Sequence, residues 1–214
     1  MIIAIDGPAG SGKTTIAKLL AQRLEIGYLD TGATYRALTL YALENDLDLA
    51  ESEQLVLAAE NITIGFLENQ VILNKINVTD KIRMPNIDKN ISAVVKHPQV
   101  RSVMVDLQRK IAVNQDYVVE GRDITTVVFP NAEFKFYLDA DTSLRARRRY
   151  EELLKKGMAI DYQEVLKDLE NRDYSDKNRE VGPLKIAVDA QYIDTSSLTI
   201  DQVVSTLTEY IKNE

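Results

Sequence analysis

Cysteine is absent from the 214-residue sequence, and His97 is its one histidine. The absence of cysteine excludes disulfides, thiolate metal sites and cysteine nucleophiles, and it favours a reducing compartment. A Ser-His-Asp triad or a multi-histidine metal site would have to be built around a single imidazole. Because His97 stands between Lys96 and Pro98, in a pattern typical of a turn at a helix end, we interpret it as structural.

Long hydrophobic runs are also absent. No stretch approaches the ~18 consecutive apolar residues that a membrane-spanning helix needs. The first residues, Met1 to Gly7, contain no basic region, and their apolar run is too short for a signal peptide. These features predict a cytoplasmic protein with no membrane partner.

Basic residues are outnumbered, since 26 lysines and arginines accompany 33 aspartates and glutamates and leave a net charge of −7. This balance disfavours binding to a nucleic-acid polymer or to an anionic membrane. With 45% hydrophobic and 28% charged residues, the chain is typical of a globular protein. Its length predicts one large domain, or one domain with an insertion. No apolar segment demands a partner, so we expect a monomer.

Short apolar runs alternate with segments of helical periodicity, which predicts an α/β fold with a mainly parallel sheet. The segment 13–24 places Ile16, Leu19, Leu20 and Leu24 on one helix face, which predicts a helix that packs on the sheet. Residues 62–83 break this alternation, because apolar segments flank a Glu68-Asn69-Gln70 turn and predict a β-hairpin in a small inserted subdomain. The expected strands of the main sheet are 2–5, 28–29, 117–119, 134–138 and 192–193.

The most specific motif is Gly-Pro-Ala-Gly-Ser-Gly-Lys-Thr at residues 7–14, which matches the G-x-x-x-x-G-K-[ST] phosphate-binding loop, or P-loop. It follows an expected strand and opens an expected helix, as the motif requires. The glycines let backbone N–H groups turn toward phosphate oxygens, and the helix N-terminus adds a favourable dipole. Lys13 would reach the β- and γ-phosphates, and Thr14 would present its hydroxyl to magnesium.

A P-loop predicts binding of a nucleoside triphosphate, but it does not distinguish a kinase from a nucleotide-dependent switch or a motor protein. The guanine-reading Asn-Lys-x-Asp of a GTP switch is met only by Asn-Lys-Ile-Asn at 74–77, which lacks the carboxylate and is interpreted as a turn. A remodelling ATPase would carry an apolar run that ends in an acidic pair, whereas the run 117–120 ends in Glu120 alone. Glu120 could support magnesium through water or be a solvated strand-end acid. Asp6 could orient magnesium-bound water or brace the loop.

Arginines favour a kinase that acts on a small substrate, because such an enzyme must neutralise a second anion. The motifs Asp30–Arg36 and Glu120–Asp123 both follow expected strands, at the carboxyl ends where open α/β sheets bind ligands. A further basic cluster in an acidic chain indicates an anionic ligand. Its members are Arg145, Arg147, Arg148, Arg149, Lys155, Lys156, Arg172, Lys177 and Arg179.

Five motifs, taken in order, closely resemble those of the bacterial cytidylate kinases, a branch of the nucleoside monophosphate kinases. They are Ile5 through Thr15, Asp-Thr-Gly-Ala-x-Tyr-Arg at 30–36, Gly-Arg-Asp at 121–123 with Val-Val-Phe-Pro at 127–130, Arg172-Asp173 running to Asn178-Arg179, and Asp-Thr-Ser at 194–196. The resemblance spans nearly the whole chain. It implies a P-loop kinase fold with a mainly parallel central sheet flanked by helices, a small inserted antiparallel sheet in the monophosphate-binding region, and a helical lid.

The resemblance also implies a division of the single domain 1–214. The core would comprise about 1–35, 84–140 and 181–214, the monophosphate-binding region about 36–83, and the lid about 141–180. The lid has no Cys-x-x-Cys zinc motif, so a ligand would have to order it. Which arginine of the run 145–149 meets ATP is open, and we expect at least two of the four to face solvent.

The implied activity is transfer of the γ-phosphoryl group of ATP to CMP or dCMP, with Mg²⁺, in pyrimidine nucleotide metabolism. Another small acceptor, or a nucleotide-sensing protein without catalysis, is the alternative. The implied catalytic residues are Lys13, Arg36, Arg122 and Arg179, and Thr14 would meet magnesium held by the ATP phosphates. The implied ATP-binding residues are Gly7, Pro8, Ala9, Gly10, Ser11, Gly12, Lys13, Thr14 and Thr15.

For the acceptor, the family places α-phosphate contacts at Arg36, Arg122 and Arg179, with Thr31 beside that pocket. Arg172 and Asp176 would hold the ribose hydroxyls, and Ser92, Arg101 and Asp123 would read the base. Cytosine presents an N4 donor with N3 and O2 acceptors, which a carboxylate and a guanidinium complement. Uracil would leave those groups mispaired, and a buried unpaired polar group costs ~1–3 kcal/mol.

Structural interpretations stand beside these roles. Arg36 could be a helix-surface cation, Asp123 a helix N-cap, and Arg172 with Asp176 a surface pair at i, i+4. The sequence also departs from the family pattern. Thr125 stands where glycine is usual, Thr34 where a larger apolar residue is usual, and Thr31 where some members carry serine. These changes bear on fine specificity and not on the reaction class.

Overall fold

The computed structural model describes residues 1–67, 70–155 and 157–213. They form two compact units, one comprising Met1–Tyr28 with Gln115–Glu214 and the other Leu29–Asn114. Each unit encloses its own hydrophobic core. Within the described residues, no helix is long and apolar enough to cross a membrane.

The first unit is built on a five-stranded sheet with the strand order β2-β6-β1-β7-β8. The central strand β1 pairs in parallel with β6 and β7, and β7 pairs in parallel with β8. The mainly parallel sheet is thereby confirmed, and each expected strand is present with slightly wider bounds. The bounds are β1 Ile2–Asp6, β2 Gly27–Asp30, β6 Tyr117–Gly121, β7 Phe134–Asp139 and β8 Gln191–Asp194.

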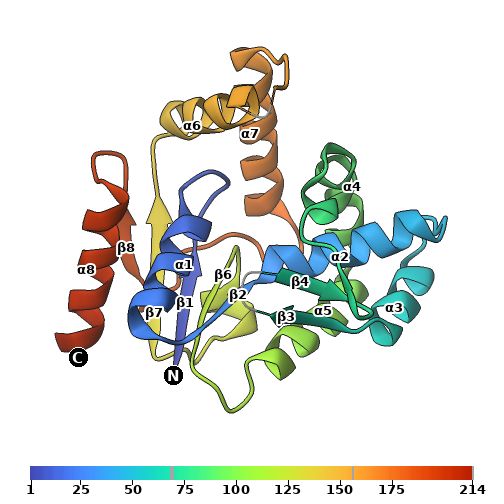
Figure 1. Ribbon diagram of the computed structural model, residues 1–214, viewed down its shortest axis with the longest axis horizontal. Helices are drawn as coiled ribbons and strands as arrows, with labels where there is room; N and C mark the ends of the chain where they lie inside the picture. The colour runs from blue at the N-terminus through green and yellow to red at the C-terminus, as the bar shows by residue number, and fades with distance from the viewer. Residues whose placement is uncertain (68–69, 156, 214) are drawn as a thin grey trace. The chain divides into compact units, whose positions relative to one another are not determined.

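Helices complete the first unit. The helix α1 (Lys13–Leu24) has the predicted bounds and packs against β6 and α8 (Ile200–Asn213). Of the four apolar residues expected on its buried face, Ile16 and Leu20 are buried and Leu24 is partly buried. Leu19 is exposed, so the expectation is wrong at that residue. The helices α6 (Thr142–Lys155) and α7 (Tyr162–Asn178) pack on each other, and Figure 1 shows them beyond the end of β7. A π-helical turn, Ile124–Val128, follows β6.

The second unit is mostly helical, with α2 (Thr31–Glu44), α3 (Ser52–Asn61), α4 (Pro85–Val95), α5 (Pro98–Ile111) and the short 3₁₀ turn Lys81–Arg83. The helix α2 packs against α3, α4 and α5. Between α4 and α5, Nε2 of His97 lies 2.9 Å from the carbonyl oxygen of Leu49. This contact agrees with the structural interpretation of His97.

The predicted hairpin is confirmed as part of a small antiparallel sheet, β3 (Ile64–Leu67), β4 (Gln70–Leu73) and β5 (Ile76–Asn77). The sequence did not predict β5, which is two residues long. Residues 68 and 69 of the expected turn lie outside the described residues. Asn74 and Lys75 have φ values of 47° and 69° and form the turn between β4 and β5, so the interpretation of 74–77 as a turn is confirmed for 74–75, whereas 76–77 form β5.

The compact units are defined by internal packing, whereas the expected core, monophosphate-binding region and lid are defined by function. The segment 84–114 lies in the second unit with 36–83, and 141–180 lies in the first unit. The functional division therefore stays a prediction.

Thr34 has a buried polar partner, which explains how a threonine replaces a larger apolar residue at this position. Its hydroxyl donates to the carbonyl oxygen of Thr31 (2.7 Å) and accepts from Nε2 of Gln108 (2.9 Å). Both side chains are fully buried. Among the described residues, Oε1 of Gln108 has no hydrogen-bond partner. The pair ties the first turn of α2 to α5.

We predict that Thr34→Val lowers the free energy of unfolding by about 1–3 kcal/mol, because Nε2 of Gln108 would stay buried without its acceptor. Adding Gln108→Leu should recover part of this loss, since both polar partners are then removed. Urea denaturation measures both changes. Thr39→Val is the matched control, because its buried hydroxyl donates only to the carbonyl oxygen of Tyr35, 2.8 Å away. Equal losses at positions 34 and 39 would contradict the pairing.

Candidate active site

The P-loop connects β1 to α1 and approaches β7 very closely. A Cβ atom added to Gly7 would lie 2.0 Å from the carbonyl oxygen of Leu138. Gly10 and Gly12 have φ values of 75° and 88°, in the left-handed region that favours glycine. The three glycines therefore permit both the close approach and the inward turn of the loop that the motif predicts.

Lys13 lies in the first turn of α1 with its side chain turned back over the loop. The side chain is buried, and Nζ donates to the carbonyl oxygen of Pro8 (2.7 Å). Burial, with the neighbouring charge of Arg122, lowers the pKa of Lys13 to about 7, although Glu120 and Asp6 oppose the shift. A lysine in this state gains the most from an anionic ligand, because added negative charge favours its protonated form.

Asp6, at the end of β1, is fully buried, and its carboxylate holds the turn that follows β6. It accepts from the backbone N–H of Ile124 and of Thr125 (both 2.8 Å) and from the Thr125 hydroxyl (2.6 Å). Burial raises the pKa of Asp6 to about 6, against the effect of these hydrogen bonds. The carboxylate braces a loop, as one interpretation expected, but the loop is the one after β6 and not the P-loop. The threonine that replaces glycine at 125 supplies two of the three bonds, and the bond from its hydroxyl is one that glycine could not make.

Glu120 and Asp123 lie at the carboxyl end of β6. Glu120 is buried and accepts from the Tyr28 hydroxyl (2.7 Å), so the interpretation of Glu120 as a solvated acid is wrong. Asp123 is also buried, and its carboxylate makes no capping hydrogen bond to the turn that follows. Instead Oδ1 of Asp123 pairs with Nη2 of Arg179 at 3.3 Å. The N-cap interpretation of Asp123 is therefore wrong as well.

Arg122, Asp176 and Arg179, all partly buried, join this acid in one group of charges. Nε of Arg122 donates to Oδ2 of Asp176 (2.7 Å), and Nη1 of Arg179 lies 3.8 Å from Oδ1 of Asp176. Burial disfavours the ionised form of Asp176, but Arg122, Arg172 and Arg179 hold its pKa below the usual range. Asp176 thus pairs mainly with Arg122 and is no simple surface partner of Arg172, whose side chain is exposed.

The second unit positions the other expected acceptor residues. Arg36 is buried on α2, where it pairs with Asp88 (2.6 Å) and donates to the carbonyl oxygen of Ile82 (3.3 Å), so it is not a helix-surface cation. The guanidinium of Arg101, on α5, lies 5.7 Å from the centroid of the Tyr35 ring.

Thr31 and Ser92 complete the expected acceptor residues of the second unit. Thr31 is the buried first residue of α2, and Ser92 is exposed on α4. The side chain of Asp30 caps α2 by accepting from the backbone N–H of Ala33 (2.9 Å) and pairs with Arg83 (2.6 Å). The sequence did not single out Arg83.

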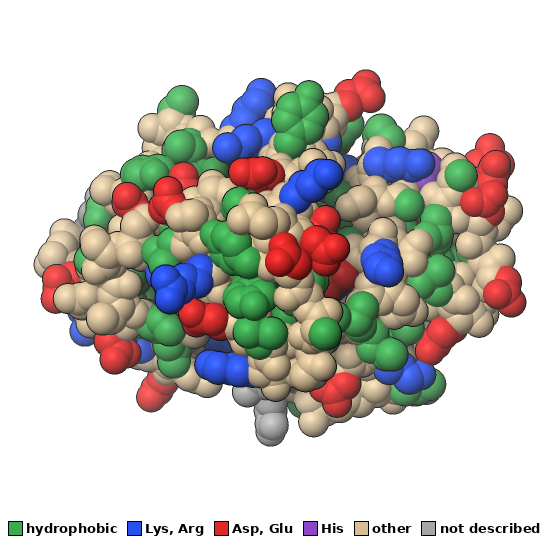
Figure 2. Space-filling view, turned by 90° about the horizontal axis from the view of Figure 1, so that it is seen from above, with side chains coloured by type: hydrophobic (Ala, Val, Ile, Leu, Met, Phe, Trp, Pro, Cys, Tyr) green, Lys and Arg blue, Asp and Glu red, His purple; other side chains and the backbone are tan. Residues whose placement is uncertain are grey.

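The four arginines of α6 divide into one buried and three more accessible side chains. Arg145 is buried, whereas Arg147 and Arg148 are exposed and Arg149 is intermediate. The expectation that at least two of the four face solvent is confirmed. Lys155 and Lys177 are exposed too, and Lys156 lies outside the described residues. On the face drawn in Figure 2, basic and acidic side chains are interspersed.

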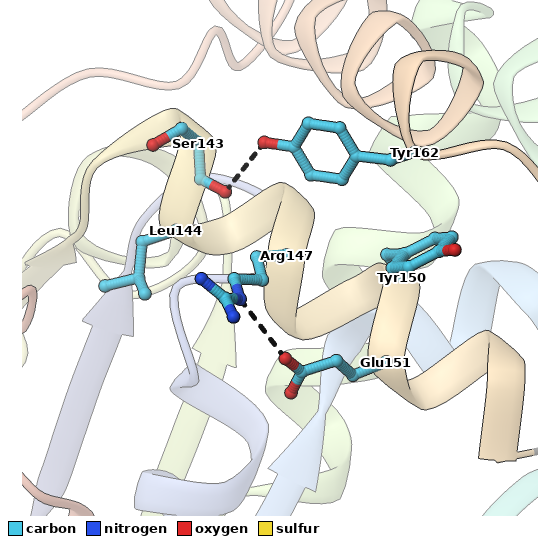
Figure 3. A pocket seen from close by; sticks show the side chains of 6 residues that line it. All are labelled: Ser143, Leu144, Arg147, Tyr150, Glu151 and Tyr162. Atoms are coloured by element: carbon cyan, nitrogen blue, oxygen red, sulfur yellow. Dashed lines mark hydrogen bonds and ion pairs between the residues drawn. The ribbon is translucent and has the colours of Figure 1, made fainter.

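A small pocket between α6 and α7 was not found by sequence reasoning. Figure 3 shows Tyr150 and Tyr162 facing each other edge to face, with ring centroids 5.9 Å apart. The Tyr162 hydroxyl donates to the carbonyl oxygen of Ser143 (3.3 Å), and Arg147 pairs with Glu151 (3.3 Å). Every side chain that lines this pocket comes from the expected lid, and no motif in the sequence marks it.

No group of three or more metal-ligating side chains gathers anywhere in the part of the chain that is described. Thr14 is exposed in the first turn of α1, beside Lys13. A single hydroxyl suits a magnesium ion that is held mostly by phosphate oxygens and water, because Mg²⁺ retains several of its waters. The Thr14 hydroxyl is therefore compatible with a magnesium ion that a nucleotide would carry.

A parallel sheet whose first strand runs through a P-loop into a helix, with buried lysine and arginines around the loop, defines a P-loop kinase. Solved structures agree on this fold. The chain matches an uncharacterised protein of Eubacterium ventriosum with a TM-score of 0.55 and 16% identity, over 100% of this chain and 99% of the other. It matches shikimate kinase from Bacteroides thetaiotaomicron with a TM-score of 0.51 and 11% identity, over 99% and 98%.

Sequence comparison defines the branch. The family model described as cytidylate kinase matches residues 3–213. Cytidylate kinase from Fusobacterium nucleatum is 47% identical over 212 residues, which cover 99% of this chain and 97% of the relative. Cytidylate kinase from Alkaliphilus oremlandii is 48% identical over 210 residues, which cover 98% and 97%. The chain belongs to the cytidylate kinase family, and the resemblance found in its motifs is confirmed.

The lowered pKa of Lys13 predicts that ATP binding takes up a proton. Near pH 8 the free lysine is mostly neutral, and the phosphates would raise its pKa by direct attraction, so roughly one proton should enter on binding. Near pH 6 the lysine is already protonated, and uptake should nearly vanish. Isothermal titration calorimetry in buffers of different ionisation enthalpy measures the number of protons taken up per ATP bound.

Lys13→Ala should remove this proton uptake and abolish phosphoryl transfer while leaving the circular dichroism spectrum intact. Lys18→Ala is the matched control, since Lys18 lies on the same helix over the Tyr28 ring and away from the loop. Uptake that persists in Lys13→Ala, or turnover near that of the parent, would exclude Lys13 as the titrating phosphate-binding group.

Proposed function

We propose that the chain transfers the γ-phosphoryl group of ATP to CMP or dCMP and releases ADP with CDP or dCDP. The observation that carries the proposal is the family match over residues 3–213, and the P-loop geometry supports it. With this activity the protein would act in pyrimidine nucleotide metabolism. We also propose that it works as a cytoplasmic monomer and uses Mg²⁺ with ATP.

For the donor, residues 7–15 would bind the ATP phosphates through backbone N–H groups and the positive end of α1. Lys13 would exchange its contact with the Pro8 carbonyl for phosphate oxygens. Thr14 would contact a magnesium ion carried by the phosphates, and that ion would spread the developing charge. This donor arrangement needs no side chain to be covalently modified.

For the acceptor phosphate, we propose Arg36, Arg122 and Arg179 as the neutralising groups. Each is partly or fully buried and held by a carboxylate, which fixes the guanidinium before substrate arrives. The acceptor phosphate is already anionic near neutral pH, so transfer can be in line and requires no general base. Positioning and charge neutralisation then supply the catalysis.

For the nucleoside, Arg172 and Asp176 would hold the ribose hydroxyls, with Thr31 beside the α-phosphate. Ser92, Arg101 and Asp123 would read cytosine. The pairing of Asp123 with Arg179 supports this role, because an ionised carboxylate can only accept hydrogen bonds, and N4 of cytosine is a donor. N3–H and O4 of uracil would meet the wrong partners.

The activity is tested by an ADP-release assay with ATP and Mg²⁺ in which CMP, dCMP, UMP, AMP and shikimate are compared at equal concentration. We expect strong turnover with the two cytidine nucleotides alone. Cytosine places its N4 donor beside the N3 and O2 acceptors, whereas uracil places its N3–H donor between two acceptors and adenine is a larger purine ring. Turnover with a different acceptor would support a kinase activity but reject the assignment of Ser92, Arg101 and Asp123 to cytosine recognition. ATP binding without ADP release from any acceptor would reject the kinase activity.

Asp123→Ala should reduce the preference for CMP over UMP by about tenfold to a hundredfold, since one base contact is worth ~1–3 kcal/mol. The ratio of kcat/KM for the two acceptors is the measurement. Asp201→Ala, which removes an exposed acid from the first turn of α8, is the matched control. A ratio unchanged in Asp123→Ala would exclude Asp123 from the base pocket.

A further inference from the structure

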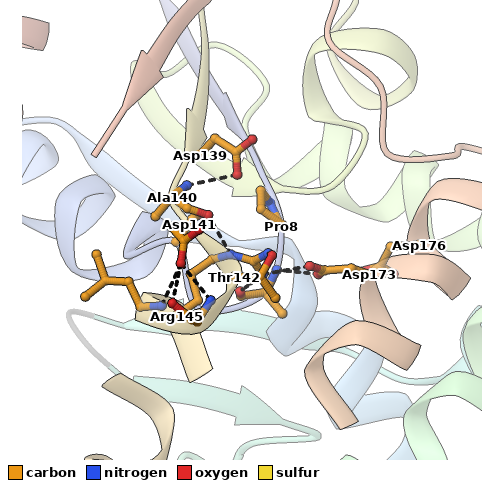
Figure 4. A network of polar contacts seen from close by, with 12 residues as sticks. Pro8, Asp139, Ala140, Asp141, Thr142, Arg145, Asp173 and Asp176 are labelled. Atoms are coloured by element: carbon orange, nitrogen blue, oxygen red, sulfur yellow. Dashed lines mark hydrogen bonds and ion pairs between the residues drawn. The ribbon is translucent and has the colours of Figure 1, made fainter. Parts of the chain in front are cut away.

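Asp173 and Arg145 hold the P-loop from one side, through Ala9. The expected site gives Asp173 no role, and it leaves open whether Arg145 meets ATP. The backbone N–H of Ala9 donates to Oδ1 of Asp173 (3.3 Å), and the carbonyl oxygen of Ala9 accepts from Nη1 of Arg145 (2.8 Å). The same Nη1 also donates to Oδ2 of Asp173 (2.7 Å). Both polar groups of one P-loop residue are thus held by one ion pair, part of the network drawn in Figure 4.

Arg145 is fully engaged in these contacts. Besides its two Nη1 bonds, Nε donates to the carbonyl oxygen of Ala140 (2.9 Å), and Nη2 donates to the Thr142 hydroxyl (2.8 Å). Its side chain is 4% exposed. A guanidinium committed at all three nitrogens and closed off from solvent is unsuited to meet ATP directly. Of the four arginines of α6, Arg145 is the one that contacts the P-loop, through the carbonyl oxygen of Ala9.

Packing brings the next residue of the loop against the same helices. A Cβ atom added to Gly10 would lie 3.4 Å from Cβ of Arg145 and 3.5 Å from Cδ1 of Leu169. Leu169 is buried on α7. The loop therefore rests directly on α6 and α7, and the Ala9 contacts are one part of a continuous interface.

We infer that Asp173 and Arg145 form a clamp that positions the P-loop for the phosphates of ATP. Three glycines with positive φ make this loop intrinsically adaptable, and a phosphate site works only when its N–H groups are already oriented. The clamp supplies that orientation through the Ala9 peptide. Both residues are positioning residues, since neither contacts the reacting atoms. The inference deepens the proposed function, on which it rests for the identity of the nucleotide.

The charges of the two residues make their roles unequal. Arg145 neutralises the Asp173 carboxylate, which otherwise would leave an uncompensated negative charge beside a loop that must accept phosphate. Loss of Arg145 therefore removes a hydrogen bond to Ala9 and also leaves the Asp173 carboxylate to repel the ATP phosphates. Loss of the Asp173 charge only weakens the contact with Ala9. The ATP affinity should consequently fall further for Arg145→Met than for Asp173→Asn.

The test is direct titration of the whole protein with Mg²⁺–ATP and, separately, with CMP. We expect Asp173→Asn to raise the Kd for ATP about tenfold, in line with the loss of a charged hydrogen bond, and Arg145→Met to raise it further. The Kd for CMP should change less than about twofold, although Asp173 adjoins Arg172, a proposed ribose contact. Asp168→Asn, the same chemical change at an exposed position of α7, should alter neither.

Equal weakening of ATP and CMP, weakening of CMP alone, or ATP binding as tight as in the parent would overturn the clamp. If Asp173→Asn does not fold, Arg145→Lys tests the same idea, because lysine keeps the charge beside Asp173 but cannot donate to Ala9, Ala140 and Thr142 at once. The ATP affinity is measured without turnover. A failure of CMP phosphorylation would therefore reject the proposed function, whereas the clamp is tested separately by the ATP affinities of the variants.

Discussion

The parallel pairing of β1 with both β6 and β7 is the constraint on which the first unit depends. Because parallel strands point the same way, the P-loop after β1, the turn after β6 and the start of α6 after β7 all begin at one edge of the sheet. The approach of Gly7 to the carbonyl oxygen of Leu138 leaves no room for a Cβ atom. The loop is therefore shaped by its neighbouring strand as much as by its own sequence.

Buried charge is the second feature that organises this edge. Lys13 and Arg145 are buried and Arg122 is partly buried, and carboxylates near each offset the loss of hydration. Asp176 and Asp173 also orient the guanidinium groups of Arg122 and Arg145.

Much of the fold and part of the site were predictable because their signals are local. The P-loop lies within eight residues, the helix after it shows its apolar face every third or fourth residue, and the strands are short apolar runs. The strand β5 escaped prediction, since two residues carry no periodicity. The roles of Asp173 and Arg145 escaped it for another reason. Arg145 and Ala9 are 136 positions apart, and no local pattern records that they touch.

The sequence by itself determined the class of the protein, the five strands of the main sheet, the helix after the P-loop, and the residue types available for phosphate binding. Only the tertiary structure decided what each charged residue does. In the folded chain Asp6 accepts hydrogen bonds from the loop after β6, and Glu120 is buried beside Tyr28. Arg145 donates to the P-loop, whereas Arg147, on the same helix, is exposed. The physical reason is that the local sequence around a charged residue does not determine whether its side chain faces solvent or an oppositely charged partner. That choice depends on which distant residues the fold packs beside it.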